Sequence, residues 1–105
     1  MTSEVEKFDY VVVGAGSAGC IIANRLSACG KYSVCVVEAG PRDWHPMLHI
    51  PAGFVKTLVN PKFNWMYSSE PSAGTNGRAI PAPRGKVLGG SSSINGMGFN
   101  RGQKM

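Results

Sequence analysis

The chain has 105 residues and a formal net charge of +5 at pH 7. Its basic side chains are dispersed, without a basic run or interleaved aromatic residues, which argues against nucleic acid as a partner. No apolar run approaches the ~20 residues of a membrane span, and the N-terminus lacks the apolar core of a signal peptide. We therefore expect a cytoplasmic protein without a membrane span.

The first third of the sequence predicts a strand, a glycine-rich turn, a helix and a second strand. Residues 8–13 are rich in aromatic and β-branched residues and carry almost no charge, which is typical of a strand buried on both faces of a parallel sheet. A helix is expected over residues 17–28, and Gly30 suits the left-handed conformation that often follows a helix. The second strand is expected over residues 34–37. This order predicts an α/β fold built on a Rossmann-like βαβ unit.

Three glycines, from the end of the first strand into the first turn of the helix, follow the Gly-x-Gly-x-x-Gly pattern of dinucleotide-binding turns. Gly14 allows the sharp turn, Gly16 lets the backbone approach a pyrophosphate, and Gly19 lets the helix pack close to the strand. Glu38 ends the second strand nineteen residues after Gly19, the spacing expected for a carboxylate that binds ribose hydroxyls. A carboxylate there repels a 2′-phosphate and disfavours NADP, but it does not separate NAD from FAD.

The middle of the chain, residues 41–83, predicts a loop-rich connection punctuated by prolines. A short helical piece is expected within residues 50–58 and a short strand within residues 64–68. Long loops in a compact domain are usually functional, so this segment is expected to cover a cofactor. His45 and His49 have the spacing of a helical metal pair, but the neighbouring prolines disfavour a regular helix and no third ligand is in view.

The cysteines and aromatic residues have simpler interpretations. Cys20, Cys29 and Cys35 are odd in number and lack metal-ligand spacing, so we expect buried thiols in a reducing compartment. Trp65 and Tyr67 are expected to lie in the core or to shield a cofactor rather than to form a stacking platform.

A second glycine-rich stretch covers residues 84–102. Its successive small residues can expose backbone N–H groups as an anion-binding nest, and Ser91 and Asn95 add side-chain hydrogen bonding. Arg84 and Lys86 flank this loop and either face an anionic cofactor or lie on the solvated surface. A flexible linker would not carry embedded aliphatic residues. A simple NAD-binding unit does not need this second loop, so the two loops together favour FAD.

Both glycine-rich stretches resemble motifs of the glucose–methanol–choline (GMC) oxidoreductase family. DYVVVGAGSAG and VVEAGP are similar to the N-terminal FAD fingerprint of that family, and GKVLGGSSSINGMGFNRG is similar to its first signature. The segments IPAG and NWMYSSEP resemble sequences found between those motifs, so the likeness extends over residues 8–102. It implies a flavoprotein that oxidises alcohols or related CH–OH donors by hydride transfer to the flavin and passes the electrons to oxygen or another acceptor.

The resemblance also implies a set of cofactor-binding residues. They are Gly14, Gly16, Ser17, Ala18 and Gly19 along the pyrophosphate; Glu38 and Ala39 at the ribose end; and Arg84, Val87, Gly89, Gly90, Ser91, Asn95, Gly96, Met97 and Gly98 toward the flavin. Some family members attach FAD through a histidine immediately before the asparagine. Ile94 holds that position here, so the resemblance implies non-covalent FAD.

The catalytic residues of the family match nothing in these 105 residues. Its catalytic histidine and the partner of that histidine belong to a region far beyond residue 105, and neither His45 nor His49 corresponds to them. No catalytic residue is therefore assigned. We expect the N-terminal part of an FAD-binding domain, without the substrate domain, that needs the rest of the polypeptide or a complementary chain.

Three segments make up this expected domain part: the βαβ unit over 8–40, the connection over 41–83 and the flavin-binding loop over 84–102. Three alternatives stay open from the sequence. The first is a GMC-fold enzyme with non-redox chemistry, such as a hydroxynitrile lyase. The second is a non-catalytic NAD-binding module. The third is a truncated product that does not fold.

Overall fold

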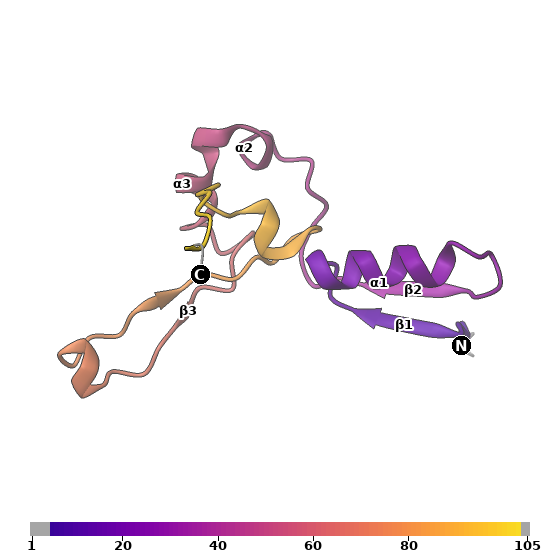
Figure 1. Cartoon of the computed structure of the whole chain (residues 1–105), viewed down its shortest axis with the longest axis horizontal. Coiled ribbons are helices and arrows are strands. Elements are labelled where there is room, and N and C mark those ends of the chain that lie inside the picture. Colours follow the sequence, from indigo (N-terminus) through magenta and orange to yellow (C-terminus); the bar gives the residue numbers. More distant parts are fainter. Residues whose placement is uncertain (1–4, 104–105) are drawn as a thin grey trace.

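The computed structural model describes residues 5–103 and has three parts (Figure 1). A βαβ unit lies at one end, a body of loops and short helices occupies the centre, and a narrow hairpin protrudes from the other side. The radius of gyration is 17.8 Å, whereas a compact domain of this length has about 13 Å. The chain is therefore considerably more extended than a compact domain.

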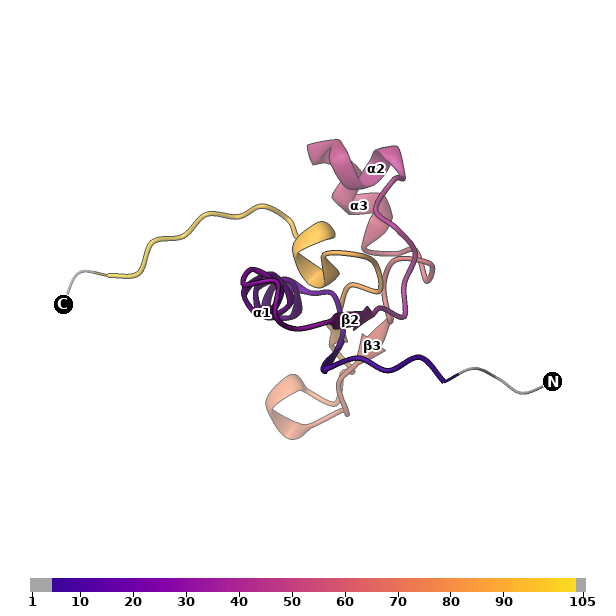
Figure 2. The same cartoon turned by 90° about the vertical axis from the view of Figure 1, so that its right-hand side faces the viewer.

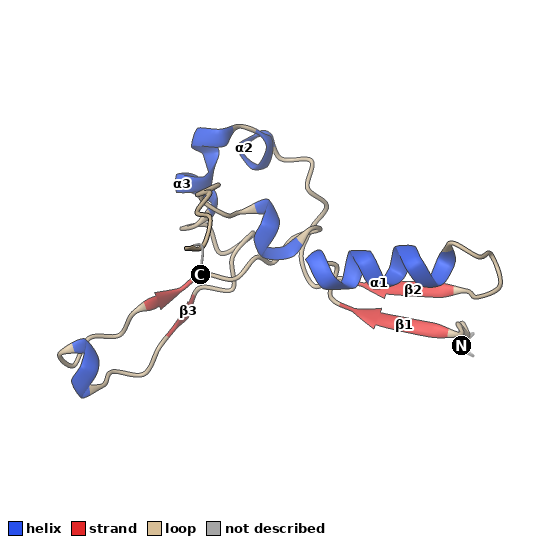
Figure 3. Cartoon of the chain, viewed as in Figure 1, coloured by secondary structure: helices blue, strands red, loops and turns tan. Residues whose placement is uncertain are grey.

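The βαβ unit contains β1 (Tyr10–Val13), α1 (Ser17–Ser27) and β2 (Val34–Val37). The two strands run parallel, with Tyr10 opposite Val34 and Val13 opposite Val37. The helix returns the chain across one face of this strand pair, as parallel strands require (Figure 3). The predicted α/β class and the parallel βαβ unit are thus confirmed.

Hydrogen bonds between two polar residues join the starts of the two strands. The Asp9 carboxylate accepts the Ser33 backbone N–H and hydroxyl, both at 2.7 Å. The Asp9 backbone N–H in turn donates to the Ser33 hydroxyl oxygen at 3.0 Å. Just after the C-terminal end of α1, Gly30 has a φ of +65°, the left-handed conformation predicted for it. Both features set where the helix ends and the second strand begins.

Burial in the βαβ unit is lower than the sequence predicted. Val11 and Val13 expose 59% and 83% of their surface, so β1 is not buried on both faces. Cys20 and Cys29 are exposed and Cys35 is half-buried, which corrects the prediction of buried thiols. The reason is that this sheet has two strands over residues 5–103, and the helix covers only one of its faces.

Three short helical pieces follow in the central body. They are α2 (Pro46–His49), the 3₁₀ turn η1 (Pro51–Gly53) and α3 (Phe54–Thr57). The helical piece expected within residues 50–58 is present. Where Pro46 and Pro51 were expected to disfavour a regular helix, the chain forms one helical turn that ends before Pro51. Pro46 occupies the first helical position, where the missing N–H removes no helical bond. No helix within residues 5–103 is long and apolar enough to cross a membrane.

The protruding hairpin pairs β3 (Tyr67–Ser68) with β4 (Pro81–Ala82) in antiparallel fashion. A 3₁₀ turn, η2 (Ala73–Thr75), lies at its tip. The strand predicted within residues 64–68 therefore exists in part, with an isolated bridge between Asn64 and Gly85 before it. In Figure 2 the two ends of the described chain extend away from the body in opposite directions.

The hydrophobic core lies in the irregular part of the molecule. Phe63, Val87 and Ile94 are each at most 2% exposed, and Leu48 and Leu58 pack against them. The last 3₁₀ turn, η3 (Gly90–Ser93), lies between two of these core residues in the sequence. Core packing therefore anchors the second glycine-rich loop on both sides of η3.

Candidate functional site

The turn between β1 and α1 is shaped to present backbone N–H groups. Gly14 has a φ of +94°, where a side chain would be strained, and its N–H donates to the Val37 carbonyl at 2.7 Å. Gly16 is the extended N-cap of α1, and no side chain within residues 5–103 caps this helix start. A Cβ at Gly19 would overlap the Gly14 carbonyl oxygen, so only glycine lets the helix pack against the turn. Exposed N–H groups at the positive end of a helix dipole form an anion-binding site.

Glu38 anchors this turn from the end of β2. Its carboxylate accepts the Ala15 N–H at 2.8 Å with one oxygen and the Gly40 N–H at 2.9 Å with the other. The sequence predicted a carboxylate for ribose hydroxyls, and the structure shows that this carboxylate holds the first glycine-rich loop. Since each carboxylate oxygen has two lone pairs, both oxygens keep acceptor capacity for a further partner.

The two glycine-rich loops meet backbone to backbone. The Gly89 N–H donates to the carbonyl of the buried Ala15 at 2.8 Å. Beside this bond, Gly90 packs so closely on the first loop that a Cβ there would lie 2.9 Å from the Gly16 Cα. Gly90 also has a φ of +60°, which favours glycine. The loops therefore form one assembled unit although Ala15 and Gly89 are 74 positions apart in the sequence.

A cleft of about 460 Å³ opens where these loops meet. It is lined by Val13, Gly14, Gly16, Val37, Glu38, Ala39, Trp65, Tyr67, Arg84, Gly85, Gly90 and Ser91. Its volume falls in the range of ligand pockets, about 300–1,000 Å³. The charged residues of this lining are Glu38 and Arg84, one of each sign. The structure thus brings together predicted residues from both glycine-rich loops and from the end of β2.

Two aromatic side chains, Trp65 and Tyr67, form one wall of the cleft, and we call this pair the aromatic wall. Their rings are stacked with centroids 5.9 Å apart and planes 3° from parallel. The Lys86 ammonium lies 4.7 Å from the centre of the Trp65 ring, within range of a cation–π interaction. Both aromatic side chains are exposed, so they are not core residues.

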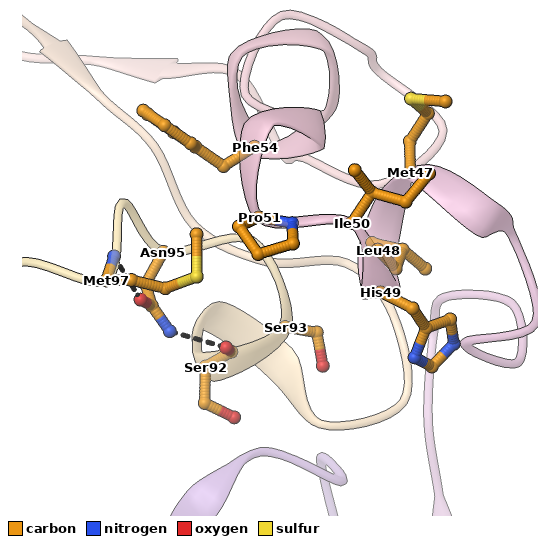
Figure 4. A pocket seen from close by; sticks show the side chains of 10 residues that line it. All are labelled: Met47, Leu48, His49, Ile50, Pro51, Phe54, Ser92, Ser93, Asn95 and Met97. Atoms are coloured by element: carbon orange, nitrogen blue, oxygen red, sulfur yellow. Dashed lines mark hydrogen bonds between the residues drawn. The ribbon is translucent and has the colours of Figure 1, made fainter.

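A second, smaller pocket of about 80 Å³ lies beside the far end of the second loop (Figure 4). It is lined by Met47, Leu48, His49, Ile50, Pro51, Phe54, Ser92, Ser93, Asn95 and Met97. The Asn95 amide donates to the Ser92 carbonyl at 2.5 Å and accepts the Met97 N–H at 2.6 Å. These bonds hold Met97 at a φ of +55°, an unusual value for a residue with a side chain. Asn95 and Met97 are therefore placed together, but apart from the lining of the larger cleft.

The remaining predicted residues differ in their surroundings. Ser17 and Ala18 are exposed in the first turn of α1, and Gly98 is exposed beyond the second pocket. Gly96 faces Phe54, since a Cβ on it would lie 3.5 Å from that ring. The side chain of Val87 is fully buried in the core, so it does not line the cleft as predicted. The sequence pattern predicted that this apolar side chain faces a cofactor. In the structure it anchors the loop in the core instead.

Asn64 is a buried polar residue, bonded to backbone near the cleft, that sequence reasoning missed. It is 3% exposed, and its side-chain oxygen accepts the backbone N–H groups of Met66 and Arg84. An asparagine is common in exposed turns, and nothing in the local sequence indicates that this one is buried.

The βαβ unit with its glycine turn and terminal carboxylate has the form of a dinucleotide-binding unit, here completed by a second glycine-rich loop. Residues 8–105 match the GMC oxidoreductase family model. The chain belongs to the GMC oxidoreductase family, whose enzymes are FAD flavoproteins.

The similar proteins are much longer than this chain. It is 50% identical over 97 residues to an alcohol dehydrogenase [acceptor] of Pseudomonas putida, covering 92% of this chain and 18% of that protein. It is 53% identical over 94 residues to an oxygen-dependent choline dehydrogenase of Rhizobium johnstonii, covering 90% and 17%. Among solved structures, pyridoxine 4-oxidase from Mesorbium loti superposes with a TM-score of 0.82 at 40% identity, covering 91% of this chain and 19% of that one. The chain thus spans less than a fifth of each of these relatives and matches their FAD-binding N-terminal region.

Proposed function

We propose that this chain is the FAD-binding N-terminal segment of a GMC-type oxidoreductase that oxidises an alcohol. The observation that carries the proposal is the cleft at which both glycine-rich loops and Glu38 meet. Membership of a flavoprotein family supports FAD over NAD as its occupant. The three segments proposed for the domain are the βαβ unit over 8–40, the connection over 41–83 and the second loop over 84–102.

The turn between β1 and α1 fits a pyrophosphate. Gly14 and Gly16 line the cleft without side chains, and the adjacent helix start presents its N–H groups. A Cβ at Gly16 would meet no protein atom closer than the Gly90 Cα at 4.0 Å, so the protein itself leaves room at this position. We propose that a phosphate occupies that room and that Ser17, Ala18 and Gly19 complete the contact.

The acidic end of the cleft fits the adenosine ribose. Glu38 and Ala39 line it, and the Glu38 carboxylate keeps acceptor capacity after binding the turn. Its two backbone hydrogen bonds hold the carboxylate in place before any ligand binds. Such preorganisation reduces the entropy that binding must overcome.

The second loop is proposed to hold the flavin end. Arg84, Gly90 and Ser91 line the same cleft, while Gly89 holds the two loops together. Val87 supports this end from the core, and Asn95, Gly96, Met97 and Gly98 extend it beyond η3. FAD held there would supply the acceptor for the hydride that leaves the carbon bearing the substrate hydroxyl. The aromatic wall covers one side of the cleft.

We propose that the cofactor is bound without a covalent bond. Ile94 has an aliphatic side chain that is 2% exposed and packed in the core, so it supplies no nucleophile. Acid precipitation of the natural protein that contains this chain should release all flavin into the supernatant. Yellow colour that remains with the precipitated protein would contradict this.

The experiment that tests the proposed function combines ligand binding with substrate reduction of the flavin. The natural protein should purify with FAD. Its flavin absorbance should bleach when it is mixed anaerobically with one member of a panel of alcohols, including choline, pyridoxine and simple primary alcohols. Bound FAD that no alcohol reduces would favour a GMC-fold enzyme with non-redox chemistry. Binding of NAD with no affinity for FAD would refute the proposal and favour an NAD-binding module.

A further inference from the structure

Asn64 connects three segments through one buried side chain. Its amide nitrogen donates to the Leu58 carbonyl at the end of α3 at 2.6 Å. Its amide oxygen accepts the Met66 N–H at 3.0 Å and the Arg84 N–H at 2.9 Å. The side chain is 3% exposed, so water cannot replace these bonds without opening the structure. Buried amides with several partners are a common means of fixing loop backbones.

These bonds determine the position of Arg84. Its N–H is held by Asn64, and its carbonyl accepts the Trp65 N–H at 2.9 Å. The following residue, Gly85, donates its N–H to the Ser91 hydroxyl oxygen at 2.9 Å. Asn64 is thereby linked to four residues of the cleft lining: Trp65, Arg84, the adjoining Gly85 and, through Gly85, Ser91.

The same amide oxygen also sets the backbone between the two aromatic rings. Met66 lies between Trp65 and Tyr67 and has a φ of +57°. This left-handed conformation is unfavourable for a residue with a side chain, so it needs support from its surroundings. The hydrogen bond from the Met66 N–H to Asn64 provides that support.

We propose that Asn64 is a positioning residue for the cofactor cleft: it places Arg84 and the aromatic wall without lining the cleft itself. The proposal rests on the proposed function only in that the cleft is taken to bind FAD. Its structural part, the placement of the wall, holds in the absence of any cofactor and can be tested separately.

The test uses the natural protein, freed of cofactor and labelled with 5-fluorotryptophan. The ¹⁹F resonance of Trp65 is identified by its loss in a Trp65→Phe variant. Asn64→Leu, which has a similar volume and no hydrogen bonds, should shift this resonance and raise the dissociation constant for FAD by about tenfold, the effect of losing one such bond. Asn64→Asp keeps the two acceptor bonds and should give a resonance closer to that of the unmodified protein.

Thr57 provides a matched control. It is 2% exposed, and its hydroxyl donates to the Phe54 carbonyl within the same helical turn at 3.1 Å. Thr57→Val should lower thermal stability but leave both the Trp65 resonance and the affinity for FAD unchanged. If Thr57→Val and Asn64→Leu shift the resonance and the affinity equally, general destabilisation explains both, and the positioning role is refuted.

Hydrogen exchange in the unmodified protein gives a measurement that does not depend on the variants folding. The Lys62 N–H donates to the Asn60 side-chain oxygen at 2.9 Å in the same i, i+2 arrangement, but at an exposed site. The Met66 and Arg84 amides should exchange much more slowly than the Lys62 amide. Equal exchange rates, or an unchanged Trp65 resonance in folded Asn64→Leu, would overturn the proposal. A shifted resonance in a protein that binds no FAD would uphold it and refute only the proposed function.

Discussion

The βαβ unit and the loop-rich half of this chain have opposite combinations of regularity and burial. The βαβ unit contains the longest helix and both parallel strands, yet the strand valines Val11 and Val13 are exposed. The loop-rich half has only short helical turns and two-residue strands, yet it contains Phe63, Val87 and Ile94, the fully packed core. Regular backbone is therefore not where this chain buries its side chains.

The difference follows from how the backbone N–H and C=O groups of each region find hydrogen-bond partners. In the βαβ unit the helix and the ladder pair backbone groups locally, whatever covers the faces. In the loop-rich half the backbone depends on bonds between distant segments, such as the Lys86 N–H to the Phe63 carbonyl at 2.7 Å. Those bonds persist only where apolar side chains exclude water around them. Core packing and loop conformation are consequently interdependent in that half.

The largest effect is expected from a side chain in the first glycine-rich loop. Gly16→Val should abolish FAD retention, because a branched side chain would occupy the space proposed for the pyrophosphate. Gly16→Ala is the informative companion, since its Cβ would lie 4.0 Å from the Gly90 Cα and the protein can accept it. It should fold normally and still weaken FAD, as measured by fluorescence titration. Normal FAD binding by Gly16→Val would show that this turn does not contact phosphate.

Glu38→Gln should weaken both the first glycine-rich turn and the binding of FAD. A glutamine has one acceptor oxygen, so its amide NH₂ would face either the Ala15 or the Gly40 N–H. Hydrogen bonds to charged groups contribute about 1.5–3 kcal/mol each. We expect an affinity for FAD lower by about tenfold or more, together with a lower thermal midpoint without cofactor. If calorimetry finds an unchanged affinity, Glu38 lies outside the site and serves only the turn.

A pair of valine substitutions tests directly where the core lies. Val87→Ala should lower the free energy of unfolding by about 1.5–3 kcal/mol, the value of burying such a side chain. Val13→Ala, at a residue that is 83% exposed, should change it by less than about 0.5 kcal/mol. Urea denaturation of both variants would measure the difference. The reverse order would mean that the sheet face of the βαβ unit is covered in the natural protein.

The smallest effect is expected from the acid that joins the two strand starts. The backbone N–H of Ser33, and then its hydroxyl, hold the pKa of Asp9 below its ordinary value of 3.8. Because the folded-state pKa is the lower one, the carboxylate stabilises the fold above pH 3.8 and loses this contribution as the pH falls toward the folded-state pKa. Asp9→Asn should reduce the acid sensitivity of the thermal midpoint. An identical pH profile in both proteins would contradict the role of this contact.

Local patterns were sufficient to predict much of the βαβ unit. The helix expected over residues 17–28 is Ser17–Ser27, and the strand expected over residues 34–37 is present with the same bounds. The left-handed Gly30 was also predicted correctly. These features depend on neighbours within a few residues, and hydrophobic period and glycine placement record such neighbours.

Burial and long-range contacts were predicted poorly. The exposure of Cys20 depends on what covers the helix, and the full burial of Val87 depends on Phe63 and Ile94. The exposed wall formed by Trp65 and Tyr67 was left undecided between core and cofactor. Each of these properties depends on a residue more than a few positions away in the sequence. No local pattern encodes which distant residue will be in contact.

The sequence by itself determined the dinucleotide-type turn, the acid at the end of the second strand and the family to which both glycine-rich loops belong, because those features are written in residue type and spacing. Only the tertiary structure decided that the loops touch, through the Gly89 N–H on the Ala15 carbonyl, and that Glu38 holds the turn as well as lining the cleft. It also decided that the buried Asn64 amide joins three segments. The physical reason is that such contacts arise when core packing brings distant backbone groups together and excludes water from them.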